Sequence, residues 1–203
     1  SNITQYFSAW GVVYGSILML FTILYMLTIL LMEKKDKEIY KGLSDTDALT
    51  GLFNRRAFQT AVDETLLKRI SGVFIFIDVD NFKDYNDKYG HANGDLCLKH
   101  FAATMKKCFP KDSILGRYGG DEFVVYIKNA ASDDAHRYMD EFQREISHLM
   151  MSGGEHVMVS ASAGGVAFIG EGEDFVSLCR SADNMLYDVK RNGKGTFKMK
   201  GAK

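Results

Sequence analysis

Three observations predict a mixed α/β sheet flanked by helices, with one transmembrane helix ahead of it. Residues 1–32 carry no charged side chain, residues 73–77 form a short apolar run, and helical and strand patterns alternate over the remainder. Of the 203 residues, 46% are hydrophobic and 25% are charged, as in globular proteins. The formal net charge of −1 argues against a nucleic-acid partner.

The apolar segment at residues 9–32 is the candidate transmembrane helix. It has 24 residues, against the ~20 that cross a bilayer as an α-helix. A signal peptide would have a basic leader and a shorter apolar core, and a buried core helix is rarely apolar on every side. Lysines follow the segment at 34–41 and none precedes it, which places the following part in the cytoplasm. We therefore expect a single-pass protein of the cell inner (cytoplasmic) membrane, with an extracytoplasmic stub at residues 1–8.

The segments after the membrane helix follow in a regular order. Residues 33–46 are charged and indicate a connector helix that Gly42 ends. Asn54 is a plausible N-cap for the first helix of the globular part, which extends to residue 200. In chain order, we expect a helix at 54–70, a strand at 73–77, a helix at 94–109, a hairpin of strands at 114–118 and 122–127, a helix at 133–151, a strand at 156–168, a helix at 174–191 and a short strand at 196–199.

Two carboxylates end the apolar run, in the triplet Asp78-Val79-Asp80. Acidic residues at the carboxyl edge of a central strand lie where α/β folds bind ligands. Their hard oxygens suit Mg²⁺, which also takes water and substrate phosphates as ligands. The alternative is a pair of solvated loop aspartates.

The expected hairpin turns through Gly119-Gly120-Asp121-Glu122. The glycines permit a tight turn and close approach of a ligand to the backbone. Two adjacent acids repel each other unless a cation or solvent compensates. A strand paired beside residues 73–77 would bring Asp121 near Asp78 and build a metal site from two distant segments. The alternative is an exposed polar turn.

The stretch after the apolar run holds candidates for nucleotide binding. Main-chain N–H groups after a strand can cradle phosphates, and Lys83 adds a charge. Asn86 and Asp95 can read a guanine edge, because a carboxylate accepts from the N1–H and N2–H₂ donors; helix capping is the alternative for both. Lys190 and Lys194, near the end of the last helix, can reach a triphosphate or else belong to a solvated basic tail.

Together, three of these segments resemble the GGDEF family in order and spacing. They are Asp47-Ala-Leu-Thr-Gly-Leu-Phe-Asn-Arg-Arg-Ala-Phe58, Asp78-Val-Asp-Asn-Phe-Lys-Asp-Tyr-Asn86 and Arg117-Tyr-Gly-Gly-Asp-Glu-Phe123. The family's fold is similar to the palm of polymerases and to class III nucleotide cyclases, which implies a mainly antiparallel sheet. The family's active members condense two GTP molecules into cyclic di-GMP. The resemblance therefore implies a GGDEF diguanylate cyclase domain at residues 47–200.

The same resemblance implies roles for individual residues. Asp78, the carbonyl of Val79 and Asp121 would hold Mg²⁺ or Mn²⁺. Glu122 would assist, and Asp121 would help to activate the attacking ribose hydroxyl. The family usually has Arg at the position of Lys194, so this chain offers a point charge without bidentate geometry there. The residues that would contact guanine or phosphates are Asn86, His91, Asp95, Lys83, Lys190 and Lys194.

The resemblance also bears on partners and control. Each domain would hold one GTP, so catalysis would need a homodimer. Many family members bind their product at an Arg-x-x-Asp motif, where this chain has Pro110 and Ser113, so we expect no inhibitory site of that type. Two alternatives remain: a catalytically silent GTP-binding signalling module, and a cyclase that uses ATP or mixed nucleotides. A phosphodiesterase is not expected, because no additional domain follows residue 203.

Overall fold

The chain divides into two units, which are described separately. The first unit ends at Ser44, and the second begins at Asp45. A computed structural model describes the backbone at residues 2–147, 149–150 and 156–200, and the side chains at 10–32, 44–147 and 157–200.

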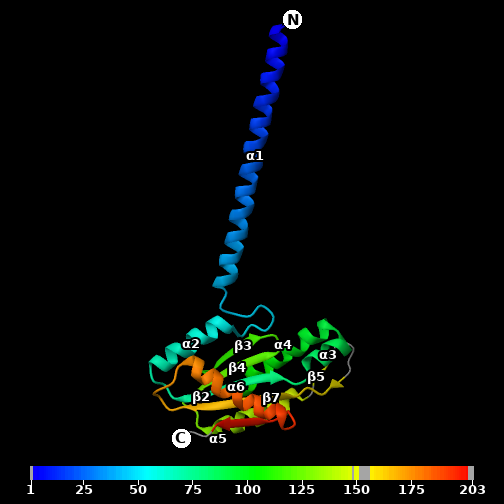
Figure 1. Ribbon diagram of the computed structural model, residues 1–203. Coiled ribbons are helices and arrows are strands. Elements are labelled where there is room, and N and C mark those ends of the chain that lie inside the picture. The colour runs from blue at the N-terminus through cyan, green and yellow to red at the C-terminus, as the bar shows by residue number, and fades with distance from the viewer. Residues whose placement is uncertain (1, 148, 151–155, 201–203) are drawn as a thin grey trace. The chain divides into compact units, whose positions relative to one another are not determined.

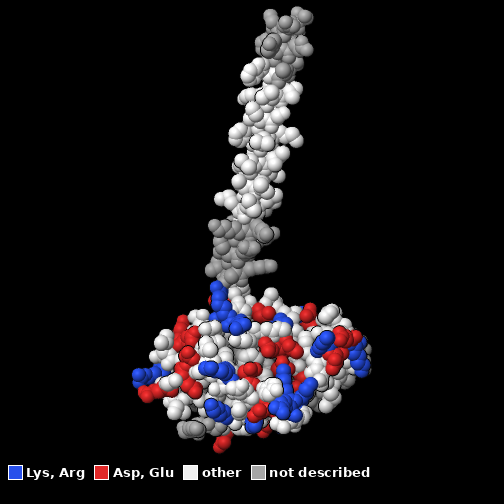
Figure 2. Space-filling view, in the orientation of Figure 1, with Lys and Arg blue, Asp and Glu red and all other residues white. Residues whose placement is uncertain are grey.

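The first unit is the single helix α1 (Asn2–Leu43). Its stretch Trp10–Met32 has a mean hydropathy of 2.3, and none of it is buried. Figure 2 shows this stretch without a charged side chain. Its serine and threonine hydroxyls, at Ser16, Thr22 and Thr28, donate to carbonyls one turn earlier, as Thr28 Oγ1 does to Tyr25 O at 2.7 Å, so these three add no unsatisfied polar group. The helix therefore has the length and composition of a membrane-spanning segment, which a signal sequence can share.

Most of the residues expected as a connector are helical, and they continue the helix of the apolar stretch. Helix α1 runs without a break through the apolar stretch and the charged residues that follow, and it ends at Leu43, one residue after the stop expected at Gly42. The helix thus ends next to Gly42, within the one or two residues by which helix bounds vary.

The second unit is a six-stranded sheet with helices on both faces (Figure 1). The strand order is β1-β3-β4-β2-β7-β8. The inner pairs are antiparallel, and only the two outer pairs, β1–β3 and β7–β8, are parallel. The sheet is thus mixed and mainly antiparallel, as predicted. Its elements are β1 (Phe53–Asn54), α2 (Arg55–Leu67), β2 (Gly72–Val79), α3 (Phe82–Tyr89), α4 (His91–Cys108), β3 (Ile114–Gly119), β4 (Glu122–Lys128), α5 (Ser132–Ile146), β5 (Leu149–Met150), β6 (His156–Val157), β7 (Ala161–Phe168), α6 (Phe175–Arg191) and β8 (Phe197–Lys200).

Strand β2 lies at the centre of the sheet and is buried on both faces. Its odd-numbered residues from Val73 to Val79 pack with α4 and α5, and Phe74 and Phe76 pack with α2 and α6. This explains why residues 73–77 read as a continuous apolar run, because neither face of the strand meets water. The carboxyl end of β2 therefore lies between the ends of β4 and β7.

Several boundaries differ from the sequence prediction. Strand β2 continues past Asp78 to Val79, and α3 occupies the stretch where a phosphate-binding loop was expected. Phe82 and Tyr85, one turn apart, give that helix an apolar side that packs on the core. Helix α4 begins at residue 91, three residues earlier than expected.

The expected helix at 133–151 and the expected strand at 156–168 were too long. Helix α5 ends at Ile146, and Leu149 pairs with Val157 in a separate two-stranded ribbon; residue 151 lies outside the described residues. The expected strand is divided into β6 and β7, because the carbonyl of Ser160 turns to accept from Asp80 N at 2.9 Å.

Two predicted helix starts are confirmed by their caps. Asn54 Oδ1 accepts from Ala57 N at 2.9 Å at the start of α2, and Asp174 Oδ1 accepts from Ser177 N at 2.8 Å at the start of α6. Helix α6 then packs so closely on β7 that a Cβ at Gly164 would collide with its backbone. This close contact fixes the middle of α6 against the centre of the sheet.

Candidate active site

The predicted acidic residues meet where β2 and β4 pair. The antiparallel register sets Asp78 opposite Glu122. One step further, Val79 N donates to the carbonyl of Asp121 at 3.2 Å. The strand-pairing argument is thereby confirmed, since two segments far apart in sequence bring their carboxylates to one sheet edge.

The electrostatics of this edge are unfavourable without a cation. Burial raises the pKa of Asp78, whose side chain is 11% exposed, and the negative charges of Asp121 and Asp80 raise that pKa further. Lys190 opposes these effects through its Nζ, which lies 2.8 Å from Asp78 Oδ2. Burial also raises the pKa of Glu122, with added contributions from Asp78 and Asp121. Carboxylates that raise one another's pKa are typical of functional sites.

Replacing Glu122 with Gln is therefore expected to raise the melting temperature near neutral pH. The pKa of Glu122 in the folded protein lies above its ordinary 4.5, so the ionised side chain destabilises the fold at higher pH. That penalty is lost as pH falls through the folded-state pKa and is absent below the ordinary value. The gain of the variant should thus vanish at about pH 4. Thermal unfolding at both pH values checks this, with Glu64→Gln on the exposed side of α2 as the control; a gain that grows at low pH would contradict it.

The donor set fits a hard divalent cation. Among residues with described side chains, no three His, Cys, Asp or Glu side chains gather into a metal-binding group. The carboxylates of Asp78 and Asp121 with the carbonyl of Val79 are instead a partial oxygen set. Mg²⁺ is commonly bound in this way, with one or two carboxylates and the rest of its shell from water and substrate phosphates; Mn²⁺ accepts the same ligands.

Asp80 has a function that sequence reasoning missed. It is 9% exposed and accepts hydrogen bonds from Ser160 Oγ at 2.8 Å, Ser162 Oγ at 2.6 Å and Gly195 N at 3.0 Å. The alternative of two solvated loop aspartates is wrong, because Asp78 and Asp80 are both buried. The alternation Ser-Ala-Ser at 160–162 was a signal in the sequence, since it places two hydroxyls on one face of the chain.

The end of α6 and the anchored loop after it each bring a lysine toward the acidic edge. Lys190 contacts Asp78, and Lys194 Nζ donates to Asn81 Oδ1 at 2.7 Å. Lys194 has φ of +61° between two glycines that also have positive φ, a conformation disfavoured for side chains other than glycine. Asp80, through Gly195 N, holds this loop in place. Lys190 therefore contacts the acidic edge directly, and Lys194, which is exposed, lies beside Asn81, the residue after Asp80.

The candidates for guanine recognition lie on α3 and α4. Asn86 lies inside α3 and Asp95 inside α4, so the capping alternative is wrong for both. Asn86 Oδ1 is buried without a hydrogen-bond partner among the described residues, and it lies so close to Gly94 that a Cβ there has no room. A buried acceptor without a partner is costly and calls for one. Asp95 and His91 are exposed in the first two turns of α4.

Lys83 lies in the first turn of α3 and is exposed. The structure replaces the expected phosphate loop with a helix start, at which Asn81 adopts φ of +54°. The first turn of a helix also presents free N–H groups to an anion, so the expected chemistry is available from different backbone geometry.

Helix α6 adds side chains to the site that the sequence did not single out. A cavity of about 380 Å³ lies between Glu122 and this helix. The residues that line it are Glu122, Asp183, Asn184, Leu186, Tyr187 and Lys190. The sequence signal that could have identified these residues is the helical spacing of 183, 187 and 190, which places their side chains on one face of α6.

Comparisons with known proteins agree with this geometry. Residues 44–196 match the family described as "Diguanylate cyclase, GGDEF domain". The chain is similar to the cyclic di-GMP phosphodiesterase PdeR of Escherichia coli (strain K12), with 32% identity over 168 residues that cover 81% of this chain and 25% of that protein. It is also similar to diguanylate cyclase A of Treponema denticola, with 31% identity over 160 residues that cover 75% of this chain and 43% of that protein.

A solved structure shows the same fold. It is the GGDEF domain of DgcB from Caulobacter crescentus in complex with c-di-GMP, with a TM-score of 0.71 and 29% identity over 76% of this chain and 92% of that chain. The chain spans less than half the length of the two curated relatives named above. The match over residues 44–196 shows that the chain belongs to the GGDEF family, the family of the diguanylate cyclase domain.

Proposed function

We propose that the chain is a diguanylate cyclase that condenses two GTP molecules into cyclic di-GMP and releases pyrophosphate. The observation that carries the proposal is the pairing of β2 with β4, which sets Asp78 opposite Glu122 and beside Asp121. Family membership and the similarity to a named diguanylate cyclase support it. The complete signature Gly119–Phe123 supports catalysis over a silent signalling module.

The reaction would join the ribose 3′-OH of one GTP to the α-phosphate of the other. The new bond forms between the 3′ oxygen and the α-phosphorus while the bond from that phosphorus to the β-phosphate oxygen breaks, which releases one pyrophosphate. A second step of the same kind, with the two nucleotides in exchanged roles, closes the ring and releases the second pyrophosphate. A divalent ion held by Asp78, Asp121 and the Val79 carbonyl would lower the pKa of the attacking hydroxyl and neutralise charge on pyrophosphate. Asp121 would accept the hydroxyl proton, with Glu122 assisting. Lys83, Lys190 and Lys194 would bind the phosphates.

Guanine would be bound between α3 and α4. The unpartnered Asn86 Oδ1 supports this placement, because it needs a donor such as the N–H groups of guanine. Asp95 would accept from N1–H and N2–H₂, with His91 nearby. Adenine presents an acceptor at N1, so the pairing with a carboxylate disfavours ATP.

The proposal also covers how two copies of the chain associate and where in the cell they lie. Two copies would face each other, each with one GTP, and α1 would hold them in the cytoplasmic membrane with the domain on the cytoplasmic side. The family match supports GTP and cyclic di-GMP as ligands. Pro110 and Ser113 lie in the turn before β3, where Ser113 N donates to Pro110 O at 3.0 Å. Neither side chain supplies a charge for product, so we propose control through the membrane side or through pairing.

A direct test uses the full chain in detergent micelles. With GTP and Mg²⁺, we expect cyclic di-GMP as the product identified by mass, and with ATP alone no cyclic dinucleotide. Binding of GTP without turnover under all metal conditions would favour the silent module. Products that contain adenine would favour the mixed-nucleotide alternative.

Asp95→Ala is expected to weaken GTP binding by about 1–3 kcal/mol, because guanine donors would be left unpaired. The fold should be unaffected, since Asp95 is exposed and lies inside α4 rather than at its cap. Calorimetry with a non-hydrolysable GTP analogue and thermal unfolding measure the two effects. The matched control is Asp140→Ala on α5, where Asp140 is also exposed; a loss of stability with unchanged affinity would refute the assignment.

A further inference from the structure

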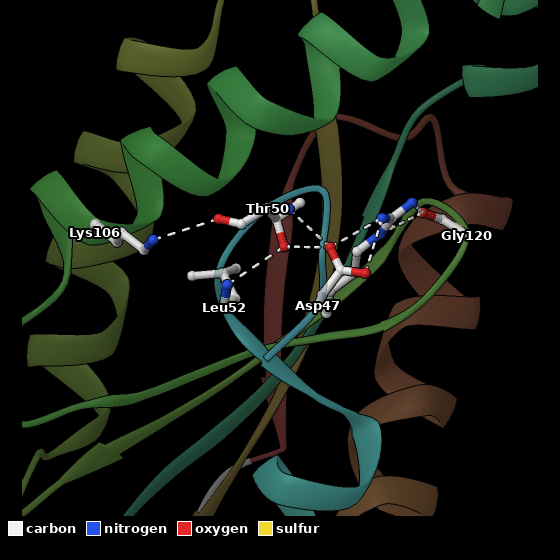
Figure 3. Close-up of polar contacts among 6 residues, drawn as sticks. Asp47, Thr50, Leu52, Lys106 and Gly120 are labelled. Carbon is white, nitrogen blue, oxygen red and sulfur yellow. Dashed lines mark hydrogen bonds and ion pairs between the residues drawn. The ribbon is translucent and has the colours of Figure 1, made fainter. Parts of the chain in front are cut away.

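The guanidinium of Arg117 contacts the Gly119–Gly120 turn and the distant Asp47 together; its two partners, Gly120 and Asp47, are labelled in Figure 3. Its Nε and Nη2 donate to the carbonyl of Gly120 at 3.0 and 2.7 Å. Its Nη1 donates to both carboxylate oxygens of Asp47, at 3.1 and 3.2 Å. The two side chains are only 15% and 24% exposed, so this ion pair is screened less than a surface pair. All three guanidinium nitrogens are thus engaged.

The turn that Arg117 contacts is irregular and exposed at Gly120. Gly119 and Gly120 have no side chains, Gly120 is exposed with φ of +38°, and the strand register shifts between Arg117 and Gly119. Glycines at an irregular turn allow many conformations. The next residue is Asp121, whose carbonyl accepts from Val79 N. The orientation of the Gly120 peptide therefore affects where Asp121 lies relative to Asp78.

Asp47 is itself fixed within the segment that leads into the domain. It accepts from Thr50 N at 2.9 Å and from Thr50 Oγ1 at 2.6 Å. Burial opposes its ionisation, but the hydrogen bonds from Thr50 and Arg117 outweigh burial and lower the pKa of Asp47. The segment is closed by a bridge between Thr46 and Phe53. It is also joined to β3 at the same point, because Asn54 is the register partner of Arg117.

A neighbouring ion pair, between Asp45 and Arg56, is much more exposed than the pair of Asp47 and Arg117. Asp45 and Arg56 lie 3.3 Å apart, and their side chains are 68% and 59% exposed. No described contact of this pair reaches the signature turn. The pair has the same chemistry in the same part of the chain and serves as a control.

We propose that Arg117 is a positioning residue: it holds the Gly119–Gly120 turn that presents Asp121, and Asp47 holds Arg117. The segment that follows α1 thereby sets the geometry of the acidic edge through one guanidinium. The inference deepens the proposed function and rests on it only for the activity measurement.

The test compares variants of the full chain in detergent micelles. Arg117→Ala is expected to lower kcat by about 100-fold, the scale of a misplaced catalytic group, and to speed amide hydrogen exchange at residues 119–121. Asp47→Asn should act in the same direction but less strongly, because the bonds to Gly120 remain. Arg117→Lys should fall between them, since an ammonium lacks the planar fork. Asp45→Asn and Arg56→Gln should leave both measurements unchanged.

Swapping the two charged residues separates the effect of Arg117 on the position of the turn from its effect on the stability of the fold. The double variant with Asp47→Arg and Arg117→Asp can restore the ion pair, but it sets a carboxylate against the carbonyl of Gly120. We expect kcat as low as in Arg117→Ala, whatever melting temperature is recovered. Recovery of kcat by the exchange would overturn the proposal. An unchanged rate of amide hydrogen exchange at residues 119–121 in Arg117→Ala would overturn the proposal as well. If that variant does not fold, the same two measurements on Arg117→Lys and Asp47→Asn decide the question.

Failure of the proposed function gives a different experimental result from failure of the positioning role. If the wild-type chain makes no cyclic di-GMP but hydrogen exchange follows the expected pattern, the cyclase assignment fails and the positioning role stands. If the wild-type chain is active and the Arg117 and Asp47 variants match it in kcat and exchange, only the positioning role fails.

Discussion

Asp121→Asn is expected to lower the rate of cyclic di-GMP synthesis by about 10³-fold or more, because metal-assisted charge stabilisation contributes several kcal/mol. The substitution removes a charged ligand and the proposed proton acceptor but keeps the shape of the side chain. The fold should remain intact and even gain stability, since one of the charges that raises the pKa of Asp78 is removed.

Initial rates at saturating GTP and Mg²⁺, together with thermal unfolding, measure these effects. Asp112→Asn is a matched control, because Asp112 is exposed in the turn before β3 and lies outside the site. A variant at position 121 that keeps near wild-type turnover would show that the metal and proton-acceptor roles are assigned wrongly. A large drop in melting temperature would instead point to a structural role.

A single copy of the chain is expected to be almost inactive. Each domain would hold one GTP, and the reaction needs two held head to tail, so pairing supplies the proximity that makes the step effectively unimolecular. Such proximity can contribute several kcal/mol. Nanodiscs that hold one copy should therefore make cyclic di-GMP at least ~10³-fold more slowly than nanodiscs that hold two.

Mixing wild-type chain with Asp121→Asn before reconstitution gives an independent measure. A mixed pair can form one phosphodiester bond but not the second, so cyclic product should fall as the square of the wild-type fraction, with a linear dinucleotide accumulating. A fall in direct proportion to the wild-type fraction, or equal rates from one-copy and two-copy nanodiscs, would rule out a shared reaction.

Much of the sheet could be predicted because its signals are local. The apolar run at 73–77 and the glycine pair at 119–120 each identify an element within a few residues. Strand pairing then follows from general rules, and it places Asp78 near Asp121. The cap at Asn54 is likewise a short-range signal that the structure confirms.

The remainder depends on contacts that no local pattern contains. Asp80 is followed by a polar stretch and reads as solvated, yet its partners lie about 80 and 115 positions away in the chain. Asp47 and Arg117 are 70 positions apart, and each belongs to a motif without any sign that they meet. Helix α3 was missed because its apolar side becomes apparent only against the core it packs on.

The two outer strands of the sheet have a consequence for how copies can associate. Strand β1 provides only two residues, and β8 alternates half-buried Phe197 and Met199 with exposed Lys198 and Lys200. Short margins and outward lysines discourage the addition of a further strand. A high local concentration of copies therefore does not favour growth of the sheet from molecule to molecule along either of these two strands.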